Sequence, residues 1–278
     1  MSYKLLKGKK GLIFGALNPN SIAWKIAERA YEEGAQILLT NAPVAMRLGE
    51  TAELAKACNT EVIYADATNL DDIEMLINST IDKFGGKMDF LLHSIGMSPN
   101  VRKGISYDNI NYDNYLKTLD ISALSLHKIL QICRKLDAIN ECGSVVALSY
   151  IASTRTLYGY NDMADAKAAL ESIARSFGYI YGREKKVRIN TVSQSPTLTT
   201  AGSGVKGFGS LFDFSERMSP LGNATAAECA DYVVTLFSDL TRKVTMQNLY
   251  HDGGFSSMGM SQEAMSQYDK SFEECGDK

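Results

Sequence analysis

The chain has 278 residues, of which 45% are hydrophobic, and its 29 basic and 32 acidic side chains give a formal net charge of −3. This balance excludes a protein that binds nucleic acid or anionic lipid through a large excess of positive charge. The length permits one large α/β domain as readily as two smaller ones.

Apolar segments alternate with helical patterns along the chain. Each apolar segment is continuous, which is typical of strands buried on both faces of a parallel sheet. The predicted strands are 11–14, 36–40, 61–64, 88–93, 143–149, 186–192 and 246–250, and the predicted helices lie at 22–34, around 54–55, at 71–84 and 112–136, after 158, and at 226–237. Right-handed crossovers between such strands predict an α/β fold, a doubly wound parallel sheet of the Rossmann type with helices on both faces.

No shift of composition marks a domain boundary, so residues 1–278 are predicted to form one domain. The stretch at about 193–224 is rich in Ser, Thr, Gly and Pro and is too long for a simple connection, which is typical of a substrate-binding loop. The tail from about 259 is Met-rich and charged, and we interpret it as a packing or subunit-contact arm.

Cysteine and histidine usage bears on location and metals. The five cysteines are widely spaced without a C-x-x-C pair, which indicates reduced thiols and a cytoplasmic protein. The three histidines are far apart in sequence, so no metal site is predicted. Charges fill the first ten residues and no uncharged apolar run approaches about 18 residues, so we expect neither export nor a membrane span.

The turn after the first predicted strand has the features of a phosphate site. Small and polar residues run from Gly15 to a helix start whose expected N-cap is Asn20 or Ser21. The free amides and the dipole of a helix N-terminus bind a pyrophosphate well. The G-x-G-x-x-G pattern is absent, so this turn alone is weak evidence.

Two further strand ends point to the same ligand. Asp66-Ala67 follows the third strand, where a carboxylate can accept from an adenine amino group, and His93-Ser-Ile-Gly96 ends the fourth, where glycine permits close backbone approach. Ligands of open α/β sheets lie across the carboxyl ends of the strands, so a dinucleotide is predicted there. His93 has no carboxylate partner nearby in sequence, and we interpret it as a structural histidine.

The fifth strand precedes a candidate chemical centre. Tyr150 follows this strand, and Tyr160 lies seven residues before Lys167, a spacing of about two helical turns that places both on one face. The ammonium is expected to lower the phenol pKa from about 10 and to donate to ribose hydroxyls, which predicts a tyrosine acid beside a nicotinamide. Ketone-reducing short-chain dehydrogenases use Tyr-x3-Lys instead, and residue 164 here is alanine.

With these motifs in this order, the chain resembles the enoyl-[acyl-carrier-protein] reductases of the FabI family, a branch of the short-chain dehydrogenase/reductase superfamily. The resemblance extends from Gly11 to about Ser257. It rests on the segments 15–23, 93–96 and 148–150, Tyr160-x6-Lys167, Ser193-Gln-Ser-Pro196 and His251-Asp-Gly-Gly-Phe255.

The resemblance implies reduction of trans-2-enoyl thioesters on acyl carrier protein in type II fatty-acid synthesis, usually by a homotetramer. Hydride passes to the β-carbon, enolate charge develops on the thioester oxygen, and the α-carbon is protonated. Tyr160 would stabilise that oxygen, Lys167 would hold the nicotinamide ribose, and Tyr150 would line the acyl pocket. The implied cofactor-binding residues are Gly15, Ser21, Ile22, Asp66, Ala67, Ser94, Ile95, Gly96, Lys167, Thr197 and Thr199, and the implied substrate-binding residues are Ser98, Tyr150 and Tyr160.

The chain departs from the family pattern at several positions. Lys25 replaces a glycine in the first helix, and Gln194-Ser195 replaces Ala-Gly. Hydroxyls at 197, 199 and 200 replace more apolar residues, which predicts added hydrogen bonds near the carboxamide and pyrophosphate. After the second strand, Thr40-Asn-Ala-Pro43 offers neither an acid for a ribose 2′-hydroxyl nor an arginine for a 2′-phosphate, so NADH is favoured and NADPH stays open.

Two alternative functions stay open. The first is a carbonyl or ketoacyl reductase of the same superfamily, which the missing Tyr-x3-Lys disfavours. The second is a non-catalytic NAD(H)-sensing protein, which the intact Tyr160 and Lys167 pair disfavours.

Overall fold

The structure, a computed structural model, describes residues 2–48, 50–203 and 207–276. Its sheet has seven parallel strands in the order β3-β2-β1-β4-β5-β6-β7. The strands are β1 (Lys10–Phe14), β2 (Gln36–Asn41), β3 (Val62–Tyr64), β4 (Met88–His93), β5 (Ile139–Ser149), β6 (Arg188–Gln194) and β7 (Asn248–His251). The strand order reverses between β1 and β4, and such a switch point opens a crevice at the carboxyl ends of the strands. The predicted fold class is confirmed.

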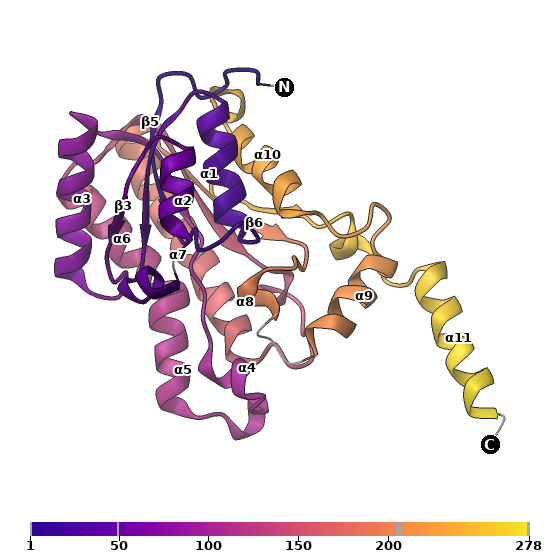
Figure 1. The fold of residues 1–278 in the computed structure, drawn as a ribbon. Coiled ribbons are helices and arrows are strands. Elements are labelled where there is room, and N and C mark those ends of the chain that lie inside the picture. Colours follow the sequence, from indigo (N-terminus) through magenta and orange to yellow (C-terminus); the bar gives the residue numbers. More distant parts are fainter. Residues whose placement is uncertain (1, 49, 204–206, 277–278) are drawn as a thin grey trace.

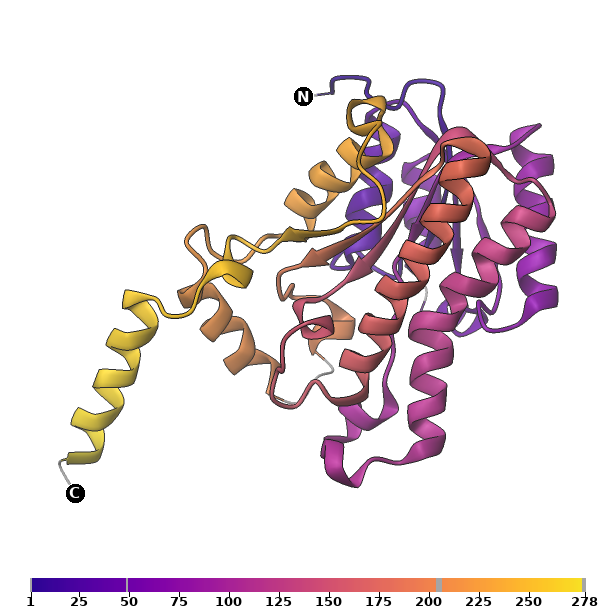
Figure 2. The ribbon, with the colours of Figure 1, turned by 180° about the vertical axis from the view of Figure 1, so that it is seen from behind.

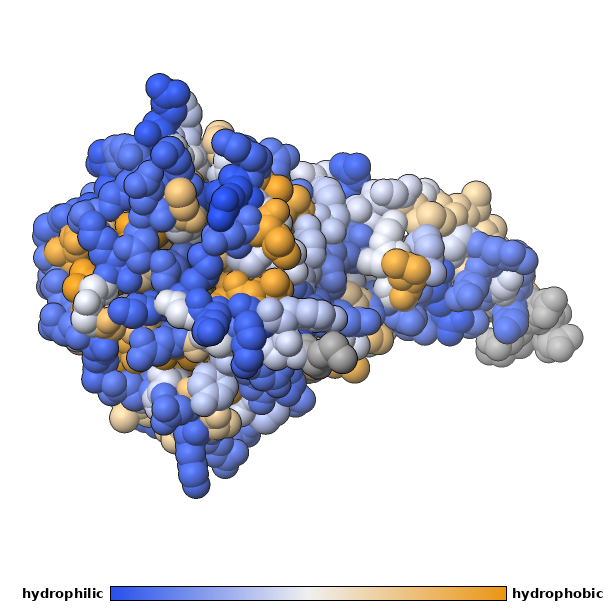
Figure 3. All heavy atoms as spheres, turned by 90° about the horizontal axis from the view of Figure 1, so that it is seen from above, coloured by the Kyte–Doolittle hydropathy of each residue, from blue (hydrophilic) through white to orange (hydrophobic). Residues whose placement is uncertain are grey.

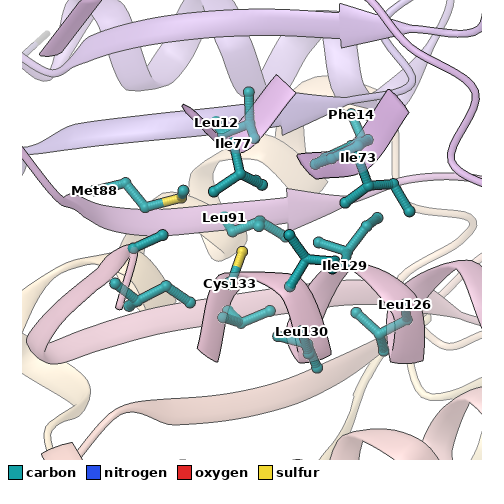
Figure 4. Close-up of a cluster of buried hydrophobic side chains, with 14 of the residues drawn as sticks. Leu12, Phe14, Ile73, Ile77, Met88, Leu91, Leu126, Ile129, Leu130 and Cys133 are labelled. Carbon is teal, nitrogen blue, oxygen red and sulfur yellow. The ribbon is translucent and has the colours of Figure 1, made fainter. Parts of the chain in front are cut away.

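Helices cover both faces of the sheet (Figures 1 and 2). One face carries α1 (Ile22–Glu32), α2 (Thr51–Ala57) and α10 (Ala226–Phe237), and the other carries α3 (Leu70–Phe84), α6 (Ser125–Lys135) and α7 (Asn161–Lys185). Each face has its own buried core, because successive strand residues point to opposite sides. Figure 4 shows the core under α3 and α6, where strand residues such as Leu12 and Leu91 meet Ile77 and Ile129.

Capping residues in the sequence fix several helix ends. Asn69 accepts hydrogen bonds from the amides of Asp71 and Asp72 at the start of α3, and Gly85 ends this helix with a φ of 59°. Thr225 and Glu228 form a reciprocal capping box at the start of α10. Satisfied amides at these positions explain why the two helices begin where they do.

The helix predicted over 112–136 is one helical run of three parts. It consists of α5 (Tyr112–Leu119), a π-helical turn (Asp120–Leu124) and α6. In this turn the Ser122 hydroxyl accepts from the Met97 amide at 3.0 Å, so the widened turn brings a side chain to the loop after β4. With the short helix α4 (Pro99–Lys103), α5 projects below the sheet in Figure 1.

The excursion at 193–224 contains α8 (Thr200–Ser203) and α9 (Phe208–Met218) rather than only a loop, and residues 204–206 lie outside the described ranges. The tail forms α11 (Gln262–Gly276), which extends from the body (Figures 1 and 2). Short 3₁₀ helices lie at Pro43–Leu48, Tyr107–Asn109, Ile151–Ser153, Asp239–Thr241 and Phe255–Ser257. The face seen in Figure 3 is mostly hydrophilic, and no helix in the described ranges is long and apolar enough to cross a membrane.

Candidate active site

The turn after β1 lies directly on the loop after β4. Gly15 has a φ of 93°, and a Cβ added there would lie 2.0 Å from the Ser94 carbonyl oxygen. Only glycine fits this position, because both the backbone conformation and the contact exclude a side chain. Two of the segments predicted to bind a dinucleotide are therefore in contact.

The predicted phosphate site lies at the start of α1. Ser21 is the N-cap, and its hydroxyl stays within the turn, where it accepts from the Leu17 amide at 3.2 Å and donates to the Asn18 carbonyl at 2.8 Å. The Ser21 side chain makes no capping bond to the first amides of this helix, which begins at Ile22, so its positive end suits an anion. Lys25 pairs with Glu28 of the same helix at 2.8 Å.

The end of β3 carries Asp66 and Ala67. Asp66 is exposed, and its Oδ1 accepts from the amide and the hydroxyl of Thr68 at 2.8 and 2.7 Å. Ala67 is half-buried against the core. These contacts fix the carboxylate at the predicted edge of the sheet, and its bond to adenine stays a prediction.

Buried polar atoms without a partner in the described residues gather along the same edge. Four of them lie near the carboxyl ends of β2, β4, β5 and β6, namely Thr40 Oγ1, His93 Nδ1, Tyr150 Oη and Ser193 Oγ. A buried polar group left unpaired costs about 1–3 kcal/mol, so such a row indicates a surface that a polar ligand completes. Amides, hydroxyls and glycine backbones of this kind fit a dinucleotide.

Lys167 lies buried behind the loop after β4. Its Nζ donates to the Leu148 carbonyl at 2.8 Å and lies 3.7 Å from the place that a Cβ on Gly96 would occupy. Burial lowers the pKa of Lys167 to about 8, and the nearby charge of Glu171 partly offsets this. The glycine leaves the ammonium open toward the loop that is predicted to bind the cofactor.

The two candidate tyrosines lie together. Tyr160 directly precedes the first residue of α7, and its ring centroid is 5.0 Å from that of the buried Tyr150, with the rings tilted by 51°. Burial raises the pKa of both phenols. The predicted lowering of the Tyr160 pKa by Lys167 is therefore wrong, because desolvation dominates and the ammonium donates to a backbone carbonyl. Both phenols stay protonated near neutral pH.

His93 has the structural role predicted for it. It is fully buried, and its Nε2 lies 2.8 Å from the Ser125 hydroxyl. Burial first, and then the charge of Lys167, lowers the pKa of His93 to about 3, so its ring is neutral. A neutral His93 ring does not repel the buried ammonium of Lys167.

The threonines of the excursion have mainly local partners. Thr197 donates to the Ser195 carbonyl at 3.0 Å, and Thr199 accepts from the Gly202 amide at 2.9 Å. Thr200 accepts from the Asn18 side chain at 2.6 Å, which joins the excursion to the turn after β1. The cofactor contacts predicted for Thr197 and Thr199, and those for Ser94 and Ile95, stay predictions.

The structure adds residues that the sequence analysis missed. Ser149 donates to the buried Glu171 at 2.6 Å, and the spacing of four between Lys167 and Glu171 was the signal that could have identified this carboxylate. Ser98, predicted to bind substrate, is buried, and its hydroxyl donates to Asp162 at 2.6 Å. Its substrate contact stays a prediction. The described residues contain no group of three His, Cys, Asp or Glu side chains suited to a metal.

The chain is similar to known proteins over nearly its whole length. A family model described as enoyl-(acyl carrier protein) reductase matches residues 15–256. The NADH-dependent enoyl-[acyl-carrier-protein] reductase 2 of Rhizobium meliloti (strain 1021) is 33% identical over 260 residues, covering 92% of this chain and 94% of that protein. The crystal structure of a FabI–NADH complex from Alistipes finegoldii is 73% identical with a TM-score of 0.94, covering 96% of this chain and 94% of that one.

A second crystal structure, of FabI from Alistipes finegoldii, is 68% identical with a TM-score of 0.92 and covers 98% of this chain and 99% of that chain. These matches span nearly the whole chain, including the Tyr160 and Lys167 region and the strand ends described above. They confirm the resemblance that the sequence motifs indicated. The chain belongs to the enoyl-(acyl carrier protein) reductase family.

Proposed function

We propose that Tyr160 and Lys167 form the catalytic centre of an enoyl-[acyl-carrier-protein] reductase that uses NADH. The protein reduces trans-2-enoyl thioesters to acyl thioesters in fatty-acid synthesis. The observation that carries the assignment is the placement of a protonated Tyr160 phenol beside Tyr150, at the sheet edge where Lys167 lies behind Gly96. NADH is also named in the relatives from Rhizobium meliloti and Alistipes finegoldii.

The chain's own residues bind and orient the cofactor. NADH, when bound, supplies the hydride. The first amides of α1 hold its pyrophosphate, and the Gly15 turn and the Gly96 loop approach it closely because neither carries a side chain. The ammonium of Lys167 donates to the nicotinamide ribose, for which it has two further hydrogens beyond the one given to Leu148.

Tyr160 stabilises the charge that develops on the substrate. As the thioester oxygen becomes an enolate oxygen, the phenol donates a hydrogen bond to it. The raised pKa keeps the proton on Tyr160, so the residue acts as a donor throughout the reaction. The ring is half-buried, which lowers the local dielectric constant and strengthens this interaction.

Tyr150 shapes the acyl pocket beside Tyr160. Its buried hydroxyl has no partner in the described residues, so it is available to a substrate. We expect Tyr150→Phe to raise the KM for crotonyl thioester by about tenfold, as loss of one hydrogen bond predicts, with a smaller change in kcat. Initial rates at saturating NADH and varied crotonyl thioester give the changes in KM and kcat separately. A loss confined to kcat would contradict the assignment.

Lys167 gives the reaction an alkaline limit. Its pKa of about 8 means that the free enzyme carries the ammonium below that pH and loses it above. We expect kcat/KM for NADH to be level below about pH 8 and to fall by about tenfold per pH unit above it, because the ribose loses its charged donor. The profile of the weaker Lys167→Ala enzyme should lack this decline. A wild-type profile that stays level to about pH 9.5 would contradict it.

Glu171 affects the pH above which kcat/KM for NADH falls. Its negative charge favours the ammonium of Lys167 and so works against the effect of burial. Replacing it with glutamine removes that charge, and we expect the alkaline decline in kcat/KM to move to lower pH. Glu184→Gln is the matched control, because Glu184 lies on the same helix and pairs with Arg134. A decline that does not move, or moves to higher pH, would refute this role.

Partners and assembly complete the proposal. Acyl carrier protein delivers the enoyl thioester, and the enzyme is a cytoplasmic homotetramer. The free thiols of Cys58, Cys133, Cys142 and Cys229 fit a reducing compartment. On α11, Met265, Tyr268 and Phe272 are exposed, which fits the predicted subunit-contact arm. Light scattering of the purified protein tests the tetramer.

Turnover with two thioesters tests the proposed activity. Crotonyl thioester should support the loss of reduced-nicotinamide absorbance with NADH, and more weakly with NADPH. Acetoacetyl thioester should not, because the alternative carbonyl reductase would use it. Reduction of acetoacetyl thioester in preference to crotonyl thioester would overturn the proposal.

A further inference from the structure

A buried carboxylate lies two residues beyond Tyr160. Asp162 is in the first turn of α7 and is fully inaccessible to solvent. Its hydrogen-bond partners among the described residues are all uncharged. A buried carboxylate is costly unless its oxygens are well satisfied, so this site has to be closely built to hold it.

Three donors from different segments converge on Asp162. Ser98 Oγ donates to its Oδ1 at 2.6 Å, and Asn100 Nδ2 donates to its Oδ2 at 2.9 Å. Thr118 Oγ1 lies 2.8 Å from Oδ2 and also 2.8 Å from the Asn114 carbonyl oxygen, so its one hydrogen is shared between these acceptors. Ser98 is the N-cap of α4, Asn100 belongs to α4, and Thr118 belongs to α5. The positive end of the α7 dipole adds to the stabilisation. Asp162 therefore joins α4, α5 and α7 at one point.

The donors leave little freedom at this joint. Ser98 Oγ accepts from the Val101 amide at 3.0 Å, so its own hydrogen is directed to Asp162. The second amide hydrogen of Asn100 goes to the Asn111 carbonyl at 3.1 Å. An asparagine at 162 would turn an NH₂ group either toward Ser98 Oγ or toward Asn100 Nδ2, so at least one of the hydrogen bonds that Asp162 now accepts would be lost.

The joint is connected to Tyr160 by packing. Val101 of α4 lies in a small buried cluster with Met163 and Ala166 of α7, and Tyr160 packs against this cluster. Met163 also approaches Gly96, since its Cε lies 3.9 Å from the place that a Cβ there would occupy. The position of α4 thus determines one wall of the Tyr160 site, and Asp162 determines the position of α4.

We propose that Asp162 is a positioning residue for the enoyl reduction. By holding α4 and α5 against the first turn of α7, it fixes the Tyr160 phenol where charge develops on the thioester oxygen. The inference rests on the proposed catalytic role of Tyr160. Asp162 touches neither cofactor nor substrate in this account and acts through Tyr160.

Asp162→Asn tests this role with little change of shape. We expect kcat with crotonyl thioester to fall by about tenfold, because misplacement of a catalytic group by a fraction of an ångström has effects of this size. NADH affinity, measured by calorimetry, should change by less than about twofold, since the α1 turn is untouched. Asp165→Asn, a half-buried carboxylate one turn further on that accepts from Tyr107 at 3.0 Å, is the matched control and should keep wild-type kcat.

A double-mutant cycle separates positioning from a general structural role. If Asp162 acts through Tyr160, Asp162→Asn should change kcat by less than about twofold in a Tyr160→Phe enzyme, where the hydroxyl to be positioned is gone. A structural role alone would give the same tenfold loss in both backgrounds and would overturn the inference. If Asp162→Asn does not fold, Thr118→Val removes one donor, and its loss of kcat should likewise vanish in Tyr160→Phe.

The cycle also keeps the two proposals apart. Wild-type kcat in Tyr160→Phe alone would overturn the proposed role of Tyr160 and this inference with it. If Tyr160→Phe strongly lowers kcat, and adding Asp162→Asn to it lowers kcat by a further tenfold, only the positioning role of Asp162 would be overturned.

Discussion

Replacing Tyr160 with phenylalanine is expected to lower kcat by about a hundredfold, because the loss of one well-placed donor to an oxyanion costs on the order of 3 kcal/mol. Tyr160 lies at the N-terminus of α7, and burial raises its pKa, so its phenol stays protonated. Some activity should persist, since solvent can supply the α-proton.

Purified variants at saturating NADH and varied crotonyl thioester measure this effect. NADH binding by calorimetry controls for folding and should be unchanged. Tyr150→Phe is the matched comparison. Each substitution removes one phenol oxygen, and the centroids of the two rings lie 5.0 Å apart. A Tyr160→Phe enzyme with wild-type kcat, or a larger kcat loss at Tyr150, would reverse the assigned roles.

Lys167→Ala is expected to weaken NADH binding by about 10- to 100-fold and to lower kcat as well. The substitution removes a charge-assisted hydrogen bond to the ribose, which contributes about 1.5–3 kcal/mol. Calorimetric titration with NADH and NAD⁺ gives the affinity directly. Lys185→Ala is the control, because that lysine lies at the far end of the same helix and donates to the Ile139 carbonyl at 3.1 Å. Unchanged affinity in Lys167→Ala would refute the ribose contact.

The sequence predicted the sheet and most of its helices because the strands are uninterrupted apolar runs. The strand at 88–93 and the helix at 226–237 have the predicted bounds, since glycines precede the first and a capping box begins the second. The π-helical turn at 120–124 was not predicted, because the hydrophobic period of a long helix does not reveal one widened turn. The helices α9 and α11 were not predicted, although apolar residues recur along both, because the Ser, Thr, Gly and Pro content of the excursion indicated a loop and the charged tail indicated an arm.

The candidate site was predictable where it depends on local spacing. The spacing of seven predicted a shared helix face for Tyr160 and Lys167, which stays a prediction because α7 begins only at Asn161, whose φ is 44°. Strand ends predicted glycine backbones where Gly15 and Gly96 lie close to their neighbours. The direction of the Tyr160 pKa shift was not predictable, because it depends on burial rather than on the nearest charge in sequence. The Asp162 joint was hidden for a related reason, since its donors lie 44 to 64 residues away.

The position of the transferred hydrogen in the product tests the central claim most directly. Crotonyl thioester is reduced with NADH that carries deuterium at the transferable C4 position, and the acyl product is analysed by mass spectrometry. An enoyl reductase places one deuterium on the β-carbon and takes the α-hydrogen from water. Deuterium on the carbonyl carbon, or its absence from the β-carbon, would contradict the account.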